Sequence, residues 1–286
     1  MSKTDRNKDK KLRKHRFVLP AVVMILLLAA LWFEHPVTEE VEVPGNGLIS
    51  APIRIALITD LHSCYYGKDQ ATIVRMVDRA EVDLVLLGGD IFDDKLKDER
   101  AKMLITQLAG KYPTYYVTGN HEYWSGHPDK MKKWVEEAGA VVLDGNYSTL
   151  EVNGNVIDIG GVDDPTDLFR DKWKSELAGA HSESGHYQIL VSHRPEEVKE
   201  YERYDYDLIV SGHAHGGQWR IPFTKRGYWA PNQGFFAEYV DGVYTLKNGS
   251  KMVVSRGLAR ESTPAPRFFN HPELVVITIN PQTEAE

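Results

Sequence analysis

Cysteine is almost missing from this chain, and that absence excludes one class of small exported protein. Cys64 is the only cysteine among 286 residues, so no disulfide can form within one chain. The chain therefore cannot be a scaffold held together by disulfides. A content of 42% hydrophobic residues is ordinary for a globular protein, and we expect the stability to come from a buried core.

Positive charge is scarce beyond the first sixteen residues. Residues 1–16 carry eight Lys or Arg against two Asp, a net of +6, whereas the whole chain carries −7. The remainder holds 26 basic against 39 acidic residues, a net of −13. Because binding to nucleic acid depends largely on neutralising phosphate charge, we expect no nucleic-acid partner.

Long apolar runs are also scarce, and the exception extends from Phe17 to Phe33, directly after the basic tail. A basic segment followed by an apolar one is typical of a secretory signal peptide or a signal anchor. Seventeen residues lie near the lower limit for crossing a hydrocarbon core of roughly 30 Å. Since no small-x-small cleavage site precedes polar sequence, we expect an uncleaved transmembrane helix, with cleavage as the alternative. The basic tail would stay cytoplasmic, which places the rest of the chain outside the cytoplasm.

The sequence contains no internal repeat and no low-complexity segment beyond the basic tail. The resulting division is a cytoplasmic tail (1–16), a membrane anchor (17–33), a linker or extended lead-in (34–51) and one folded domain (52–286). We expect the folded domain to begin near Ile53.

Apolar runs alternate with helical patterns in the first half of this domain. The expected strands span 53–60, 83–88 and 113–118, and the expected helices span 71–80, 97–110 and 128–138. Continuous apolar strands separated by helices argue for a sheet covered by helices. Later β segments are expected within 141–161, 189–192, 208–211, 244–254 and 274–279. The pattern favours two sheets packed face to face with helices outside.

Five short polar clusters stand out because each follows an apolar strand. They are Asp60-x-His62, Gly88-Gly89-Asp90 with Asp93, Gly119-Asn120-His121-Glu122, Ser192-His193, and Gly212-His213-Ala214-His215. Each cluster alone is weak, since a lone histidine is more often structural and an aspartate at a strand end is often a cap. Five of them in order indicate a metal site. Their carboxylate, imidazole and amide groups suit Mn²⁺, Fe or Zn²⁺ rather than a soft cation or an all-oxygen Ca²⁺ site.

The spacing within the clusters has a physical rationale. Residues i and i+2 of an extended chain point to the same side, so Asp60 with His62, and His213 with His215, would each present two ligands to one cleft. Rigid strand ends suit two cations about 3.5–4 Å apart. A glycine precedes Asp90 and several other ligand candidates, and we expect it to let the backbone turn sharply.

Together, these clusters resemble the signature of the calcineurin-like metallophosphoesterase superfamily: D-x-H, G-D-x-x-D, G-N-H-[DE], H and G-H-x-H. The resemblance covers Ile53 to His215, and every core position is filled. Ser192-His193-Arg194-Pro195, the segment 267–273 and the anchor are similar to the membrane-anchored bacterial YkuE-type branch. The resemblance implies an α/β fold, a four-layer α-β-β-α sandwich, here preceded by one transmembrane helix.

The resemblance also implies two divalent metal ions, with Mn²⁺ favoured and Zn²⁺ or Fe as alternatives. The ligands of the first ion would be Asp60, His62, Asp90 and His215, and those of the second would be Asp90, Asn120, His193 and His213. Asp90 would bridge the ions, and a hydroxide between them would attack phosphorus in line. His121 would contact the phosphate or protonate the leaving oxygen. Asp93 would orient Asn120 or a ligand histidine.

Other residues have weaker functional interpretations. Arg194 and Arg267 are candidates for binding a second phosphate of the substrate, with structural ion pairing as the alternative. Cys64 is expected to be a small loop residue rather than a ligand, and Glu122 is expected to cap a turn. The aromatic segment 219–239 is expected to pack against the second sheet, with a cleft wall or lipid contact as the alternative.

The combined prediction is a hydrolase of a phosphoester or pyrophosphate bond. An anchor beside an active site favours a phospholipid or lipid-linked substrate. The alternative within the enzyme class is a phosphodiesterase or phosphatase acting on soluble exported nucleotides or phosphoproteins. A non-catalytic membrane tether is a further alternative, although such relatives usually lose metal ligands and this sequence keeps them all.

Overall fold

A computed structural model describes residues 33–166, 170–220, 224, 227–263 and 266–281, together with residues 18, 20, 23, 24 and 28. The basic tail (1–16) and all but a few residues of the predicted anchor (17–33) lie outside this part of the chain. No helix within the described ranges combines the length and apolar character that a membrane crossing needs. The anchor stays a prediction from the sequence.

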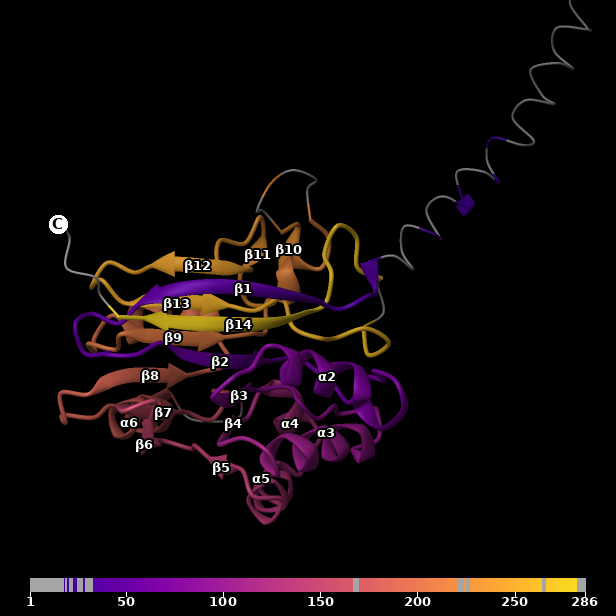
Figure 1. The fold of residues 1–286 in the computed structure, drawn as a ribbon. Helices are drawn as coiled ribbons and strands as arrows, with labels where there is room; N and C mark the ends of the chain where they lie inside the picture. Colours follow the sequence, from indigo (N-terminus) through magenta and orange to yellow (C-terminus); the bar gives the residue numbers. More distant parts are fainter. Residues whose placement is uncertain are drawn as a thin grey trace, which may run out of the picture.

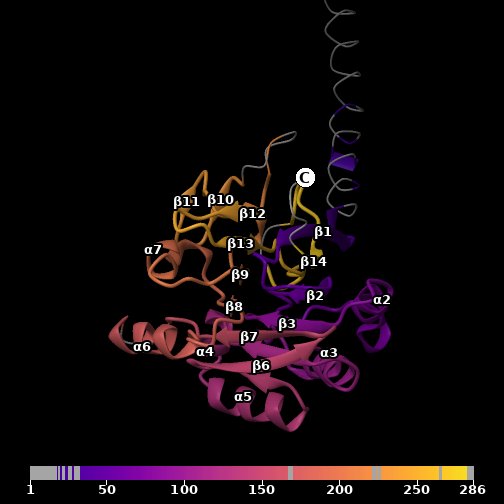
Figure 2. The same cartoon turned by 60° about the vertical axis from the view of Figure 1, so that its left-hand side comes forward.

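Two six-stranded sheets form the centre of the molecule (Figures 1 and 2). In order, the first sheet contains β1 (Val37–Pro44), β14 (Glu273–Asn280), β2 (Ile53–Ile58), β3 (Leu84–Gly88), β4 (Thr114–Val117) and β5 (Val141–Val142). The second contains β12 (Gly242–Thr245), β13 (Lys251–Val254), β9 (Leu208–Ser211), β8 (Tyr187–Val191), β7 (Asn155–Gly161) and β6 (Asn146–Val152). A short hairpin, β10 (Trp229–Ala230) and β11 (Gly234–Phe235), pairs separately.

Parallel pairing dominates the middle of both sheets. In the first sheet β2, β3, β4 and β5 run parallel, and β14 runs antiparallel to β2. In the second sheet β7, β8, β9 and β13 run parallel, and β6 and β12 close the two edges in the antiparallel sense. Parallel neighbours end on the same edge of a sheet, so each sheet brings several strand ends together.

Helices cover the outer faces of the two sheets (Figure 2). The first sheet packs against α2 (Ala71–Arg79), α3 (Glu99–Ala109) and α5 (Pro128–Glu137), and the second packs against α6 (Arg170–Ala180) and α7 (Val198–Tyr201). Alternation along β2 shows the layering, because Ile55 faces the core between the sheets while Ala56 faces the core beneath α2. The four-layer arrangement expected from the sequence is the one that the structure has.

The segment 34–51, expected to be a linker or extended lead-in, belongs to the first sheet. Strand β1 pairs in parallel with β14 from Val37↔Glu273 to Pro44↔Asn280, and Val43 is 2% exposed. The sheet therefore begins before Ile53. The polar stretch Thr38-Glu39-Glu40 hid this strand, because β1 is an edge strand whose outward side chains face water.

We predict that a chain starting at Pro52 is less stable than one starting at Glu34. Removing β1 uncovers the edge of β14 and exposes apolar surface that Val43 now covers, a loss of at least about 2 kcal/mol. Urea unfolding of the two chains measures the difference. Equal midpoints and equal slopes would contradict a structural role for β1.

Candidate metal centre

The predicted ligands meet where the carboxyl ends of strands from both sheets converge. Asp60 follows β2, Asp90 follows β3, and Asn120 opens the short helix α4 (Asn120–Trp124) after β4. His193 follows β8 and His213 follows β9 in the second sheet. All five side chains are at most 3% exposed. Residues far apart in the chain are thus gathered into one buried cluster.

One group of ligand atoms comes from Asp60, His62 and His215. One ligand atom from each lies within 4.8 Å of the others. The distance from His215 Nε2 to Asp60 Oδ1 is 3.6 Å, and the His62 and His215 rings stack with centroids 5.3 Å apart. This group is suited to hold one cation.

A second group comes from Asp90, His193 and His213, with ligand atoms again within 4.8 Å of one another. His193 Nε2 lies 3.1 Å from Asp90 Oδ2, and His62 Nε2 from the first group lies 3.6 Å from that same oxygen. Asp90 therefore stands between the two groups, where a bridging carboxylate is needed.

Several of these atoms have no hydrogen-bond partner, which is the strongest local indication of metal. Within the described part of the chain, Asn120 Oδ1 and His215 Nδ1 are buried without a hydrogen-bond partner, while His62 Nε2, His193 Nε2 and Asp90 Oδ2 have no closer contact than those with one another, at 3.6 and 3.1 Å. Buried polar groups are normally satisfied, and leaving one unpaired costs about 1–3 kcal/mol. The donor set and its unpaired atoms fit divalent cations with oxygen and imidazole ligands.

The charge balance of the cluster points in the same direction. Burial lowers the pKa of His193, but the Asp90 carboxylate outweighs this and raises it to about 10. Burial lowers the pKa of His213 to about 3, and the neighbouring His193 and Arg194 act in the same sense. The buried carboxylates thus favour positive charge nearby. A proton on His193 provides part of this charge, and bound cations would provide more of it.

Backbone strain is concentrated at the ligands. Of the seven predicted ligands, five adopt a positive φ: Asp60 (50°), His62 (47°), Asp90 (51°), His213 (65°) and His215 (47°). Each non-glycine residue in this region costs of order 1–3 kcal/mol. The prediction that each pair projects from an extended strand was wrong, because both members turn after the strand has ended.

The glycines next to the ligands allow close approach. A Cβ at Gly119 would collide with the Asp90 carboxylate, and a Cβ at Gly212 would collide with the Asp60 carboxylate. Gly119 has an extended conformation (φ −116°, ψ −171°). Gly119 therefore matters for its missing side chain, whereas Gly89 before Asp90 has the left-handed conformation (φ 89°) that the expected sharp turn requires.

Glu122 organises the backbone around Asp90. Its Oε1 accepts the N–H groups of Ile91 (2.8 Å) and Phe92 (3.0 Å). Its Oε2 accepts those of Asp90 (3.0 Å) and Gly119 (2.7 Å). The carboxylate is fully buried and joins the loop after β3 to the start of α4. The expected capping role is present, and it extends to a second loop.

His121 lies at the rim of the cluster with a side chain that is 19% exposed. Its Nδ1 is 2.7 Å from Asp94 Oδ1 and 3.3 Å from Asp93 Oδ1. Burial lowers the pKa of His121, but Asp93, Asp90 and Asp94 raise it to about 9. Asp93 Oδ1 also lies 3.1 Å from His62 Nδ1. Asp93 thus orients a ligand histidine, one of the two roles expected for it.

Arg194 enters the site from the second sheet. It makes two hydrogen bonds to Asp164, from Nε (2.5 Å) and Nη2 (2.9 Å), and its Nη1 lies 2.9 Å from His213 Nε2. The sequence analysis missed Asp164. The signal was available, because Asp163-Asp164 follows β7 just as the other clusters follow their strands.

Arg267 is bonded mainly to backbone beside the cluster, and its Nη1 is buried without a partner in the described part of the chain. It is 1% exposed, and it donates to the carbonyl oxygens of Ala259, Arg256 and Gly257. These carbonyls belong to the loop that packs Gly257 against Asp60. The geometry gives Arg267 the structural alternative and a position behind the ligands.

Cys64 is fully buried, and burial raises the pKa of its thiol. The sulfur lies 3.3 Å from the backbone nitrogen of Arg260 and 3.5 Å from Ser262 Oγ. It joins none of the ligand groups found among the described residues. This agrees with the expected role as a small loop residue.

The aromatic segment 219–239 differs in part from its expected packing. Ala230 and Ala237 pack in the core of the second sheet, and Tyr239 packs against that core as expected. In contrast, Trp219, Tyr228, Trp229, Phe235 and Phe236 are 45–65% exposed. The small side chains of the segment and Tyr239, and not these exposed rings, anchor it.

We predict that Glu122→Gln destabilises the protein and weakens metal binding. One amide NH₂ would face two backbone N–H groups, which costs about 1–3 kcal/mol. Displacement of the Asp90 loop should lower Mn²⁺ affinity by about 10–100-fold. Urea unfolding and Mn²⁺ titration test this, with Glu136→Gln on the exposed face of α5 as control. Wild-type stability and affinity in Glu122→Gln would show that the four contacts are dispensable.

Comparisons with known proteins agree with this geometry. The family model described as calcineurin-like phosphoesterase matches residues 53–217. An uncharacterized metallophosphoesterase of Campylobacter jejuni is 30% identical over 254 residues, covering 84% of this chain and 62% of that protein. One from Aquifex aeolicus is 31% identical over 234 residues, covering 79% and 85%. YkuE of Bacillus subtilis is 28% identical over 232 residues, covering 79% and 78%.

Two further findings concern how much of its relatives this chain covers and which solved structures share its fold. The chain spans about three fifths of the length of the first curated relatives, from Campylobacter and Helicobacter. Among solved structures, the NAD nucleotidase of Haemophilus influenzae matches with a TM-score of 0.51 and 18% identity, over 73% of this chain and 46% of that one. That likeness concerns the fold alone. The matched segment contains all five clusters, and the chain belongs to the calcineurin-like phosphoesterase family.

Proposed function

We propose that the chain is a dinuclear metal-dependent hydrolase of a phosphoester or pyrophosphate bond. The observation that carries this proposal is the set of buried, unpartnered ligand atoms on both sides of Asp90. A purely structural cluster would satisfy these atoms with hydrogen bonds. A non-catalytic tether would have no use for them.

In this proposal, Asp60, His62 and His215 would hold one ion, Asn120, His193 and His213 would hold the other, and Asp90 would contribute to both. When bound, divalent ions lower the pKa of water and neutralise charge that builds on the phosphate oxygens. We favour Mn²⁺, with Zn²⁺ or Fe as alternatives. His193 donates from Nδ1 to the carbonyl of Gly88 (2.8 Å), which leaves its Nε2 lone pair for a ligand bond.

His121 supplies a proton to the leaving oxygen. Asp93 and Asp94 favour its protonated form, and its partly exposed ring is accessible to substrate. Asp94 and Asp93 fix the ring from the Nδ1 side, so Nε2 is the nitrogen that faces substrate. Proton transfer by a positioned acid typically contributes 10²–10⁴-fold.

Arg194 contributes fixed positive charge beside His213. Two hydrogen bonds to Asp164 hold the guanidinium in place before substrate arrives. A preorganised arginine favours a phosphate group with its negative charge. Arg267 has no such role in this proposal.

The substrate that we favour is a membrane-associated phospholipid or a lipid-linked phosphate. The exposed aromatic rings of the segment 219–239 support this choice. The hairpin β10–β11 that carries two of them also carries Asn232, whose Oδ1 lies 3.3 Å from His213 Nε2. An exposed apolar surface therefore lies close to the candidate ligands, so a substrate held in a membrane at this surface would be near them.

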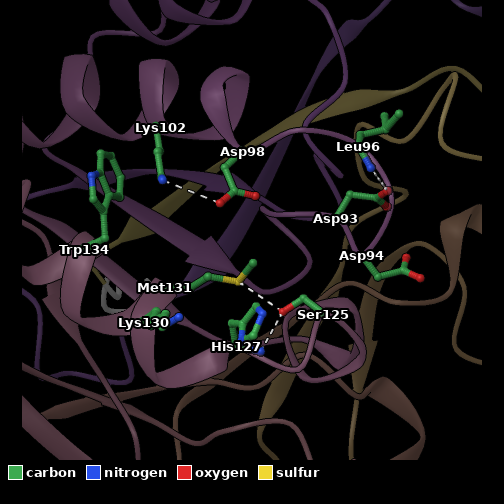
Figure 3. Close-up of a pocket in the computed structure, with 10 residues that line it drawn as sticks. All are labelled: Asp93, Asp94, Leu96, Asp98, Lys102, Ser125, His127, Lys130, Met131 and Trp134. Atoms are coloured by element: carbon green, nitrogen blue, oxygen red, sulfur yellow. Dashed lines mark hydrogen bonds and ion pairs between the residues drawn. The ribbon is translucent and has the colours of Figure 1, made fainter.

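A different observation favours the alternative, a soluble charged substrate such as a nucleotide. A cavity of about 320 Å³ lies between α3, α5 and the loop that follows β3, with the charged groups Asp94, Asp98, Lys102 and Lys130 in its lining (Figure 3). Asp94 both lines this cavity and contacts His121. A polar leaving group could extend from His121 into it.

We predict that the full chain hydrolyses bis(p-nitrophenyl) phosphate only with added metal. Chelation should abolish the activity and Mn²⁺ should restore it. Asp90→Asn and His213→Ala should each lower it at least about 100-fold, because each loses a ligand atom. Asp171→Asn, on the exposed end of α6, serves as the matched control.

Absence of activity with Mn²⁺, Zn²⁺ and Fe²⁺, together with absence of bound metal by mass spectrometry, would favour the tether. Within the enzyme class, relative rates on a lipid pyrophosphate and on a soluble dinucleotide distinguish the two substrates. Faster turnover of the dinucleotide would replace the lipid choice by the alternative.

A further inference from the structure

A group of exposed aromatic side chains lies beside the candidate metal centre. This aromatic face consists of Trp219, Tyr228, Trp229, Phe235, Phe236 and Phe269, which are 45–65% exposed. Soluble proteins commonly expose single apolar residues, whereas a contiguous apolar patch usually marks an interaction surface. The number of rings that gather here requires an explanation.

Four of the rings are in contact although they come from separate segments, and Phe269 is linked to them through its chain neighbour Phe268. The Tyr228 ring lies 5.4 Å from Phe235, 6.2 Å from Phe236 and 6.4 Å from Trp219. Trp219 in turn contacts Phe268, with centroids 5.8 Å apart. The face therefore continues from the hairpin β10–β11 to the segment before β14.

Two of the rings are held outward by unfavourable backbone. Phe236 (φ 58°) and Phe269 (φ 52°) adopt the left-handed region, which is rare for bulky residues and costs of order 1–3 kcal/mol each. Neither ring recovers this cost by burial, since they are 59% and 53% exposed. Both rings are thus exposed although their backbone conformations are unfavourable.

Residues next to the aromatic face contact both candidate ligands of the cluster Gly212-His213-Ala214-His215. Asn232, at the turn of the hairpin, lies 3.3 Å from His213 Nε2 through its Oδ1. Asn270, next to Phe269, donates from Nδ2 to the carbonyl of His215 (2.7 Å). A molecule bound to the aromatic face would therefore lie close to the candidate metal ligands.

One end of the face meets the end of the apolar run in the sequence. The Phe33 ring lies 4.9 Å from the Phe269 ring and 5.0 Å from the ring of His271. Phe33 is the last residue of the uncharged run that begins at Phe17. If this run is in a membrane, the bilayer begins where the aromatic face begins. In both views β10 and β11 lie on the upper side of the sandwich (Figures 1 and 2).

We propose that the aromatic face docks on the surface of a phospholipid bilayer and holds the metal centre beside it. Trp and Tyr favour the boundary between hydrocarbon and water, where the ring is apolar and its polar atom stays hydrated. The preference for a bilayer over a protein partner rests on the contact with Phe33. The docking does not depend on the proposed hydrolase activity. The delivery of a lipid substrate to the metal centre does rest on that proposed function.

Docking is tested first without any activity measurement. The full chain is reconstituted in phosphatidylcholine–phosphatidylglycerol vesicles with or without brominated acyl chains, and tryptophan quenching is compared among variants. Trp219→Phe/Trp229→Phe should lose at least a third of the quenching of wild type. Trp124→Phe, which removes an indole 57% exposed on α4, should keep it. Equal quenching in both variants would overturn the proposal.

Delivery of substrate is tested by kinetics with the same full chain. In Trp229→Ser/Phe235→Ser, KM for a vesicle-borne phosphate diester should rise at least fivefold, with turnover of soluble bis(p-nitrophenyl) phosphate within twofold of wild type. Tyr147→Ser, which removes a ring 45% exposed on β6, should change neither. An equal loss on both substrates would assign the hairpin to the shape of the metal centre and overturn the docking role.

Two other outcomes distinguish bilayer docking from the proposed hydrolase activity and from a protein interface. Wild type without activity on the soluble diester would contradict the proposed hydrolase, while the quenching would still decide the docking. A dimer in wild type that Trp229→Ser/Phe235→Ser dissociates, without quenching by brominated lipid, would make the face a protein interface and overturn the bilayer.

Discussion

The buried negative charge of Asp90 is the constraint on which the rest of the site depends. The carboxylate is 1% exposed, and a charge removed from water must find partners of opposite sign. The His121 N–H donates to its Oδ1 (2.8 Å), and His193 Nε2 lies 3.1 Å from its Oδ2. The missing side chain at Gly119 makes room for it, and Glu122 holds the backbone on both sides. Each arrangement supports one carboxylate in a position that favours cations.

The fold explains how a site with strained backbone and unpaired ligand atoms can be maintained. Parallel strands in two facing sheets deliver their carboxyl ends to one region, and the cores between and outside the sheets make those ends rigid. Rigidity permits the left-handed conformations of Asp60, Asp90 and His213, because the surrounding structure over-determines them. Strain and unpaired ligand atoms are both costs to the metal-free protein. Both are reduced if binding of metal stabilises the native state by mass action.

Much of this could be predicted from the sequence, and the exceptions have physical causes. Buried strands and amphipathic helices such as α2 leave a clear hydrophobic period, and the ligands follow those strands. Strand β1 was missed because its outward residues are charged, and α6 because its apolar residues are few and weakly periodic. The contacts of Asp94 with His121 and of Asn232 with His213 depend on loop conformations that no short pattern encodes. The carbonyl contacts of Arg267 were also beyond reach, because sequence does not distinguish an arginine that binds carbonyls from one that faces a ligand.

The central claim is that two cations share the Asp90 carboxylate, and anomalous scattering tests it most directly. Crystals of the full chain grown with Mn²⁺ would be measured at the manganese absorption edge. The account predicts two peaks about 3.5–4 Å apart, one near Asp60, His62 and His215 and one near Asn120, His193 and His213, with Asp90 between them. A single peak, or two peaks of which neither contacts Asp90, would contradict it.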